Sequence, residues 1–291
     1  MDITKQIPYN ELNDILFQQR VKVFIIRLDS IHPIVSGNKI FKLHYFIKEC
    51  LKKENPAIIT YGGAWSNHLI AAAYAAKEYH IPITGIVRGE APSVLSETLQ
   101  KCIEYGMQLQ FVSRKDYRAL RYEDSPDPAI TIIPEGGYHP IGAAGASLIV
   151  DKISPISPTH IVTATGSATT TAGLLIGSDT NTSVVSVAVL KNYHDLHQRI
   201  HYLSAGKFID RLQQWDYHFG GFAKYTDELI SFMNSFYEKY VIPLDFVYTA
   251  KMMYGVLDKI KEGYFPEGSV IACLHTGGLQ GNISIQKHLV F

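Results

Sequence analysis

The sequence predicts an α/β protein in which helices cover a mostly parallel sheet. Short runs rich in valine and isoleucine alternate with segments of helical periodicity, a pattern typical of this class. Hydrophobic residues make up 46% of the chain and charged residues 19%, a globular balance that excludes disorder for most of its length. The 291 residues correspond to roughly two domains of about 150 residues each.

Eight apolar runs are the expected strands. Most of them are too continuous for a strand with one solvated face, so we expect strands buried on both faces, as in parallel sheets. In chain order they are Val21–Leu28, Ala57–Thr60, Ile83–Val87, Leu109–Val112, Ile130–Ile133, His160–Thr163, Ser183–Leu190 and Ser269–Leu274.

Between these runs, apolar residues recur at the spacing i, i+3, i+4 and i+7, which predicts amphipathic helices. Ser66 and Asn67 are good N-cap residue types before an alanine-rich helix. The charged segment 113–127 mixes both signs and predicts a solvated excursion rather than a binding patch. The expected helices lie around Leu43–Leu51, Leu69–Ala76, Leu174–Ile176, Leu229–Tyr240 and Met252–Ile260.

Four loops that follow apolar runs combine glycine with hydroxyl or amide residues. They span 61–67, 135–137, 165–170 and 275–278. Any one of them alone is as well explained by a tight turn. Right-handed crossovers place such loops at the carboxyl ends of parallel strands, where these folds bind ligands. Together the four loops therefore favour one shared ligand site.

One of these loops has the features of an anion cradle. A strand ends, a glycine turns the chain and hydroxyl side chains open a helix, over Thr165, Gly166, Ser167, Ala168, Thr169 and Thr170. The lysine of a nucleotide P-loop is absent, and the first strand is not followed by G-x-G-x-x-G. A compact phosphate fits this loop best, and a helix capped by Ser and Thr is the alternative of similar weight.

A lysine and three histidines are further candidates. Lys39 lies where a glycine turn enters a helix, and the helix dipole lowers the pKa of such an amine toward the nucleophilic, neutral form. From local sequence alone a surface lysine is favoured about three to one. His194, His197 and His201 share a helical face, but no carboxylate or cysteine completes a metal site, so we expect no metal.

Charge and cysteine content restrict the partners. Lys+Arg and Asp+Glu both number 27, so the overall field favours neither nucleic acid nor an anionic membrane. The three cysteines form no disulfide framework, which fits a reducing, cytoplasmic compartment. The N-terminus lacks a signal-peptide pattern, and no apolar run reaches about 18 residues. We therefore expect a small-molecule ligand and no nucleic acid or membrane partner.

The motifs, taken in order, resemble those of the 1-aminocyclopropane-1-carboxylate deaminase and D-cysteine desulfhydrase family. The likeness runs from about Val21 to Gly281, through SGNKIFKL, TYGGAWSNH, PEGGYHPIGAAG, ATGSATTTAG and VYTAKM, followed by LHTGG. This resemblance implies the pyridoxal-phosphate cofactor and the tryptophan-synthase-β type fold (fold type II), with two domains that each hold a mostly parallel sheet. It also implies a smaller domain, 42–142, inserted into a larger one, 1–41 and 143–291, and a homodimer.

The resemblance further implies the roles of individual residues. Lys39 is the Schiff-base lysine, Asn67 bonds the cofactor's phenolic oxygen and Thr276 faces its pyridine nitrogen. The loop 165–170 holds the phosphate, and Tyr248 stands beside the reacting carbon. Ser66 lies near the substrate carboxylate on the face opposite the lysine. The remaining expected substrate contacts are Trp65, Asn67, His68 and Thr249.

Two positions indicate the branch of the family. Thr249 and Thr276 match the desulfhydrases, which release pyruvate, ammonia and hydrogen sulfide from D-cysteine. Phe246 and Phe222 depart from the family pattern, the second by lacking an expected tyrosine hydroxyl that Tyr225 could replace. The alternatives are a 1-aminocyclopropane-1-carboxylate deaminase, a cofactor-binding protein without turnover and an unrelated phosphate-binding α/β protein.

Overall fold

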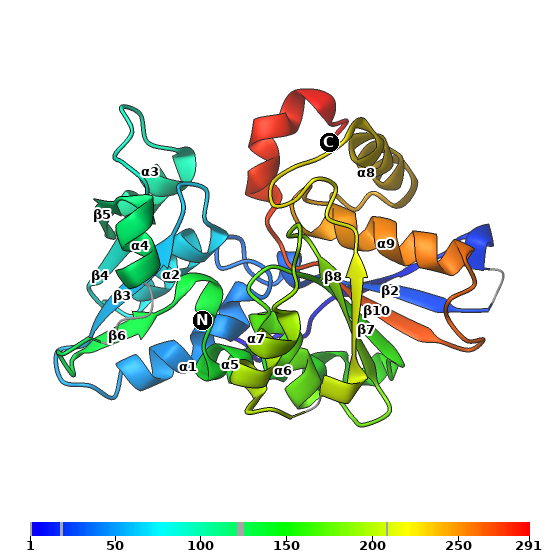
Figure 1. The fold of residues 1–291 in the computed structure, drawn as a ribbon, viewed down its shortest axis with the longest axis horizontal. Helices are drawn as coiled ribbons and strands as arrows, with labels where there is room; N and C mark the ends of the chain where they lie inside the picture. The colour runs from blue at the N-terminus through cyan, green and yellow to red at the C-terminus, as the bar shows by residue number, and fades with distance from the viewer. Residues whose placement is uncertain (1, 18–19, 121–124, 208) are drawn as a thin grey trace.

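Two separate sheets organise the chain (Figure 1), as seen in a computed structural model that describes residues 2–17, 20–120, 125–207 and 209–291. The larger sheet has six strands in the order β1-β2-β10-β7-β8-β9, and the smaller has four in the order β5-β4-β3-β6. All neighbouring strands run parallel except β1, which pairs antiparallel with β2. The strands are β1 (Tyr9–Leu12), β2 (Lys22–Ile26), β3 (Ala57–Gly62), β4 (Ile83–Arg88), β5 (Gln108–Val112), β6 (Ile130–Ile133), β7 (His160–Thr165), β8 (Ser183–Ala188), β9 (Leu212–Asp216) and β10 (Val270–Leu274).

The predicted fold class is confirmed, and each of the eight expected strands is present. The sequence did not predict β1 or β9, the two edge strands of the larger sheet. In β1 three of four residues are exposed, and β9 carries mostly polar residues. Neither strand contains the apolar run from which strands were predicted, whereas β5 and β6, the edge strands of the smaller sheet, are apolar enough to be predicted.

Helices follow most strands and cover the sheets. The sequence predicted α1, α2, α6, α8 and α9 among them. The helices are α1 (Lys39–Cys50), α2 (Asn67–Glu78), α3 (Glu97–Glu104), α4 (Arg114–Leu120), α5 (Pro140–Ile153), α6 (Thr169–Gly177), α7 (Leu196–Ser204), α8 (Asp227–Tyr240) and α9 (Thr249–Lys261). Short 3-10 turns are η1 (Ile15–Phe17), η2 (Leu28–Ser30), η3 (Glu135–Gly137), η4 (Ser154–Ile156), η5 (Ile209–Arg211) and η6 (Leu279–His288).

The charged segment expected to be a solvated excursion contains α4. This helix buries the Tyr117 side chain completely, and the Tyr117 hydroxyl donates a hydrogen bond of 3.1 Å to the Glu135 carboxylate. One aromatic residue among many charges gives too weak a periodicity to predict a helix. The part of the expected excursion at 121–124 lies outside the described residues.

Glycines bring α1, α5 and α6 into backbone contact. A Cβ on Gly145 of α5 would lie 2.1 Å from the Phe41 carbonyl oxygen of α1. A Cβ on Gly173 of α6 would lie 2.7 Å from the Ala143 carbonyl oxygen of α5. Only glycine permits such an approach. The three-helix layer therefore fixes the start of α1 relative to the start of α6.

One apolar core runs through both sheets. It joins Ile58 and Ile83 of the smaller sheet to Ile161 and Val184 of the larger sheet through the helices between them. A second cluster fills the other face of the larger sheet, under α8 and α9. Such a continuous core resists separation of the two sheets. In the part of the chain that is described, no helix is long and apolar enough to cross a membrane.

All three cysteines are buried as free thiols: Cys50, Cys102 and Cys273. Burial raises the pKa of the Cys102 thiol to about 12 and also raises that of Cys273. They belong to the apolar cores.

Candidate active site

The four glycine-containing loops meet at one place, as the sequence predicts. The Ser167 hydroxyl donates to the Gly136 carbonyl at 3.4 Å, which joins the loops at 135–137 and 165–170. Asn67 lies against Gly278, whose added Cβ would be 3.2 Å from the Asn67 side-chain nitrogen. Loops from the smaller sheet thereby contact loops from the larger sheet at the carboxyl ends of their strands.

Lys39 is the first residue of α1 and points its amine at this meeting point. The Lys39 amine donates to the Asn38 side-chain oxygen at 2.7 Å. The Asn38 amide in turn donates to the Thr170 hydroxyl at 2.7 Å, so the lysine is connected to the start of α6. Burial lowers the pKa of Lys39 to about 8, against the opposing effect of the Asp245 charge. The surface-lysine alternative is therefore wrong, and burial is the chief cause of the lowered pKa.

The loop from Thr165 to Thr170 forms a concave start to α6. Ala168 has a left-handed backbone with φ of +68°, and the helix begins at the next residue. The hydroxyl groups of Ser167 and Thr169 lie 3.0 Å apart at this end. The first turn of a helix presents N–H groups without intrahelical partners, which suit an anion.

Thr165, one of the expected cofactor contacts, is placed differently from its neighbours. Its hydroxyl is buried and lies 2.8 Å from that of Thr171. The Ser186 hydroxyl donates to the same Thr165 oxygen at 2.8 Å. This chain of hydroxyls joins β7, α6 and β8 beneath the loop, so the Thr165 side chain supports the cradle from below.

Lys42 is a site residue that the sequence did not predict. It lies one turn after Lys39, is 5% exposed, and donates from its amine to the Gly136 carbonyl at 3.2 Å. Ser167 donates to that same carbonyl, so Lys42 lies beside the cradle. Burial, reinforced by the charge of Lys39, lowers the pKa of Lys42 well below its usual range. Its spacing of three from Lys39 on one helical face was the available signal.

The residues at the start of α2 separate into exposed and buried positions. The Ser66 hydroxyl accepts from the Leu69 N–H at 3.2 Å and so caps the helix, as predicted. The Asn67 side chain accepts a hydrogen bond from Gln280. Trp65 is 55% exposed at the edge of the site, so a bound molecule can reach it.

His68 is 4% exposed and holds a neutral ring. Its Nε2 lies 2.9 Å from the Thr60 hydroxyl, whereas its Nδ1 has no hydrogen-bond partner among the described residues. Burial and the charges of Lys42 and Lys39 lower the pKa of His68 to about 3. A buried polar atom without a partner is a place where a bound ligand could supply the missing bond.

Tyr248 faces the cradle from the start of α9. Its ring edge is 3.3 Å from the position of a Cβ on Gly166, so a side chain there would press on the tyrosine. Burial raises the pKa of Tyr248, which keeps its hydroxyl protonated. Tyr248 therefore lies next to the loop at 165–170, and its expected place beside the reacting carbon stays a prediction.

Asp245 holds the segment that carries Tyr248 and was not predicted as a functional residue. One carboxylate oxygen accepts the N–H groups of Val247 and Tyr248, at 3.0 and 2.9 Å. The other accepts the N–H and the hydroxyl of Thr249, at 2.9 and 2.7 Å. Thr249, an expected substrate contact, therefore uses its hydroxyl within this network. An aspartate just before a helix was the signal for such a cap.

Thr276, in the loop that follows β10, is buried and lies in close contact with Gly37. A Cβ on Gly37 would lie only 1.8 Å from the Thr276 carbonyl oxygen, and Gly37 has φ of +70°. Only glycine meets both conditions without strain. The glycine turn before α1 therefore brings Lys39 and Thr276 into one site.

The two phenylalanines that depart from the family pattern have different surroundings. Phe246 is buried, and the Tyr225 ring packs edge-on against it with centroids 5.6 Å apart. Phe222 is 50% exposed and packs edge-on against Tyr248 with centroids 6.0 Å apart. Phe222 thus lines the entrance beside Tyr248, whereas Tyr225 lies against Phe246.

Comparisons with known proteins identify the relatives of this chain. The family model described as pyridoxal-phosphate dependent enzyme matches residues 3–277. A Pyrococcus horikoshii protein, provisionally named as a 1-aminocyclopropane-1-carboxylate deaminase, is 30% identical over 95% of this chain and 90% of its own. The mitochondrial bifunctional D-cysteine desulfhydrase/1-aminocyclopropane-1-carboxylate deaminase of Arabidopsis thaliana is 27% identical over 89% of this chain and 73% of its own. A crystal structure described as that of a 1-aminocyclopropane-1-carboxylate deaminase homologue covers 99% of this chain and 95% of its own, at 27% identity and a TM-score of 0.82.

Proposed function

Because the chain belongs to the pyridoxal-phosphate dependent enzyme family, we propose that it is a lyase acting on a small D-amino acid. Our first candidate reaction converts D-cysteine and water to pyruvate, ammonia and hydrogen sulfide. The observation that carries the proposal is the Lys39 amine, partly neutral near pH 8 and joined through Asn38 to the start of α6. An amine so placed can react with the aldehyde of a molecule whose phosphate lies at that helix.

The donor set fits the cofactor. The hydroxyls of Ser167 and Thr169, the start of α6 and the buried Lys42 amine would hold a phosphate. Gly166 leaves room beside Tyr248, which a Cβ would reduce. In our proposal Asn67 bonds the phenolic oxygen and Thr276 faces the pyridine nitrogen.

In our proposal, Lys39, Tyr248 and Thr276 each have a different role in moving or holding protons. The bound cofactor supplies a conjugated ring that accepts the electron pair released at the substrate's Cα. Lys39, with a pKa of about 8, can both accept and return a proton at its Nζ. Tyr248 keeps its proton and can donate a hydrogen bond to the departing group. Thr276 offers a neutral hydroxyl, which stabilises ring-nitrogen protonation less than a carboxylate would.

Deamination of 1-aminocyclopropane-1-carboxylate to 2-oxobutanoate and ammonia is the second candidate. It is supported by the names of the relatives, one of which carries both activities in its name. Thr276 supports D-cysteine, whereas Thr249 discriminates less because Asp245 holds its hydroxyl. A cofactor-binding protein without turnover has less chemical need for Lys39, so this third candidate ranks lowest.

The test is product formation by the purified protein loaded with pyridoxal phosphate. Sulfide from D-cysteine but not from L-cysteine would support the first candidate, and 2-oxobutanoate from the cyclopropane substrate would support the second. Lys39→Ala should abolish both turnover and the visible absorption of the lysine-bound cofactor. Lys48→Ala, on an exposed position of the same helix, is the matched control and should retain both. Retention by Lys39→Ala would contradict the assignment.

We also propose the domain division and assembly that the resemblance implies. A smaller domain, 42–142, would be inserted between 1–41 and 143–291, which agrees with the separate sheet formed by β3 to β6. We propose a homodimer in the cytoplasm with no nucleic-acid or membrane partner. Light scattering after size-exclusion chromatography, giving the mass of one chain rather than two, would contradict the dimer.

A further inference from the structure

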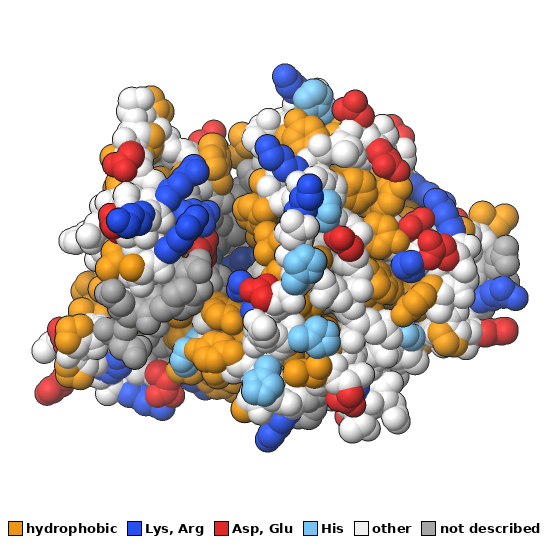
Figure 2. Space-filling view, in the orientation of Figure 1, with side chains coloured by type: hydrophobic (Ala, Val, Ile, Leu, Met, Phe, Trp, Pro, Cys, Tyr) orange, Lys and Arg blue, Asp and Glu red, His pale blue; other side chains and the backbone are white. Residues whose placement is uncertain are grey.

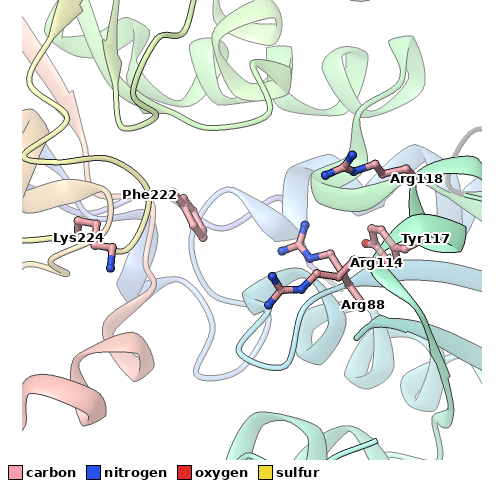
Figure 3. A pocket seen from close by; sticks show the side chains of 6 residues that line it. All are labelled: Arg88, Arg114, Tyr117, Arg118, Phe222 and Lys224. Atoms are coloured by element: carbon pink, nitrogen blue, oxygen red, sulfur yellow. The ribbon is translucent and has the colours of Figure 1, made fainter. Parts of the chain in front are cut away.

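A cavity of about 720 Å³ opens beside the candidate active site and is lined mostly by cations. Arg88 at the end of β4, together with Arg114 and Arg118 of α4, forms one wall (Figure 3). Phe222 and Lys224 lie on the opposite wall (Figure 3). In the space-filling view a hollow separates the two parts of the molecule, with Lys and Arg side chains gathered on one rim (Figure 2).

One lining residue on each wall of the cavity contacts a residue of the candidate active site or of its loops. A guanidinium nitrogen of Arg88 lies 3.4 Å from the position of a Cβ on Gly63, in the loop that leads to Ser66. On the other wall, Phe222 packs against Tyr248. A molecule whose reacting carbon lies beside Tyr248 can therefore extend past Phe222 toward the arginines.

Within the described part of the chain, the cations of this cavity outnumber the carboxylates that pair with them. A carboxylate oxygen of Glu135 lies 3.8 Å from a guanidinium nitrogen of Arg88 and partly balances the charge of that arginine. Among the described residues, no carboxylate lies within ion-pair distance of Arg114, Arg118 or Lys224. Arg114 and Arg118 are four apart on α4 and so share a helical face, where like charges repel. Two arginines that line the same cavity from one helix offer several donors to a ligand of opposite charge.

We propose that this cavity binds a second acidic group of the amino-acid substrate, at the end distant from the reacting carbon. A guanidinium group binds carboxylate, sulfonate and phosphate oxygens through paired hydrogen bonds, which makes arginine suited to all three. Lys224 approaches from the other wall as a point charge. The inference rests on the proposed function and narrows it: elimination needs a leaving group at Cβ, and the cavity adds recognition of a distal anion.

The test compares two ligands that differ only in charge. D-Glutamate and D-glutamine have nearly the same shape and carry their second group beyond Cβ, and each is titrated into the pyridoxal-phosphate-loaded enzyme while the absorption spectrum of the cofactor is recorded. We expect D-glutamate to bind at least about tenfold more tightly than D-glutamine, as charge-assisted hydrogen bonds imply. The Arg114→Gln/Arg118→Gln double variant should bring the two affinities to within about twofold. Lys224→Gln, on the other wall, should reduce the preference partially.

Lys115→Gln is the matched control, because Lys115 lies on α4 but not in the cavity lining, and it should keep the full preference. Equal affinities in the unaltered enzyme would overturn the inference, as would a preference that survives the double variant or is lost equally in the control. In each of these outcomes the protein would still hold the cofactor at Lys39, so the proposed function would stand. A protein that does not bind pyridoxal phosphate at all would overturn the proposed function as well, so the two failures are distinguishable.

Discussion

Acidification below pH 8 should slow the capture of pyridoxal phosphate by the apoenzyme, because protonated Lys39 is not a nucleophile. With a pKa of about 8, roughly one Lys39 amine in ten is neutral at pH 7. An ordinary lysine, with a pKa of about 10.4, is neutral about once in a few thousand molecules at that pH. Burial therefore accounts for a gain of about two hundredfold or more in reactive amine at pH 7.

In the Asp245→Asn variant, the pH dependence of cofactor capture should shift to lower pH. The Asp245 charge favours the protonated amine, so its removal lowers the pKa of Lys39 below about 8. The assay mixes apoenzyme with pyridoxal phosphate from pH 6 to 10 and follows the visible absorption of the lysine-bound cofactor. Nα-acetyl-lysine in the same buffers corrects for titration of the cofactor itself. A midpoint near that of the free lysine, or a shift toward alkali in Asp245→Asn, would refute the reasoning.

Three further variants test the site and its supports. Gly37→Ala forces a Cβ onto the Thr276 carbonyl and should lower the free energy of unfolding by about 2 kcal/mol or more, measured by urea denaturation. Tyr248→Phe should slow turnover at least about tenfold while the cofactor remains bound; loss of cofactor would instead indicate a structural role. Lys251 is buried and donates to the carbonyls of His218 and Gly221, each at 2.8 Å, so Lys251→Met should free the loop that carries Phe222 and raise KM more than it lowers kcat.

The sequence predicted the parts of the fold that are buried on both faces. Runs such as Ser183–Leu190, whose strand β8 pairs with both β7 and β9, are apolar because neighbours surround them, so composition alone identifies them. The strands β1 and β9 and the helix α4 contain polar residues that the surface permits, and their structure depends on partners distant in sequence. The Tyr117 hydrogen bond to Glu135, eighteen residues away, illustrates this dependence.

The candidate site was predictable in its location and only partly in its contacts. Glycines and hydroxyls at strand ends indicated where the loops meet, because those residue types have few other uses there. The hydrogen-bond partner of each hydroxyl was not predictable. The hydroxyls of Thr165 and Thr249 bond to other side chains of the protein, Thr171 and Asp245 respectively. Lysine is a residue type usually found on the surface, and Lys42 is buried because α1 packs against α5 and against the loop at 135–137.

The burial of the three cysteines has a consequence for the sulfide that the proposed reaction would release. Persulfides and sulfenic acids form on accessible thiolates, and burial in apolar surroundings disfavours both access and ionisation. With Cys102 and Cys273 held as thiols and Cys50 enclosed in the core, the folded chain presents no exposed sulfhydryl to its product or to oxidants. In the proposed reaction of D-cysteine, the folded chain would therefore offer no accessible thiol at which the released sulfide and an oxidant together could form a persulfide.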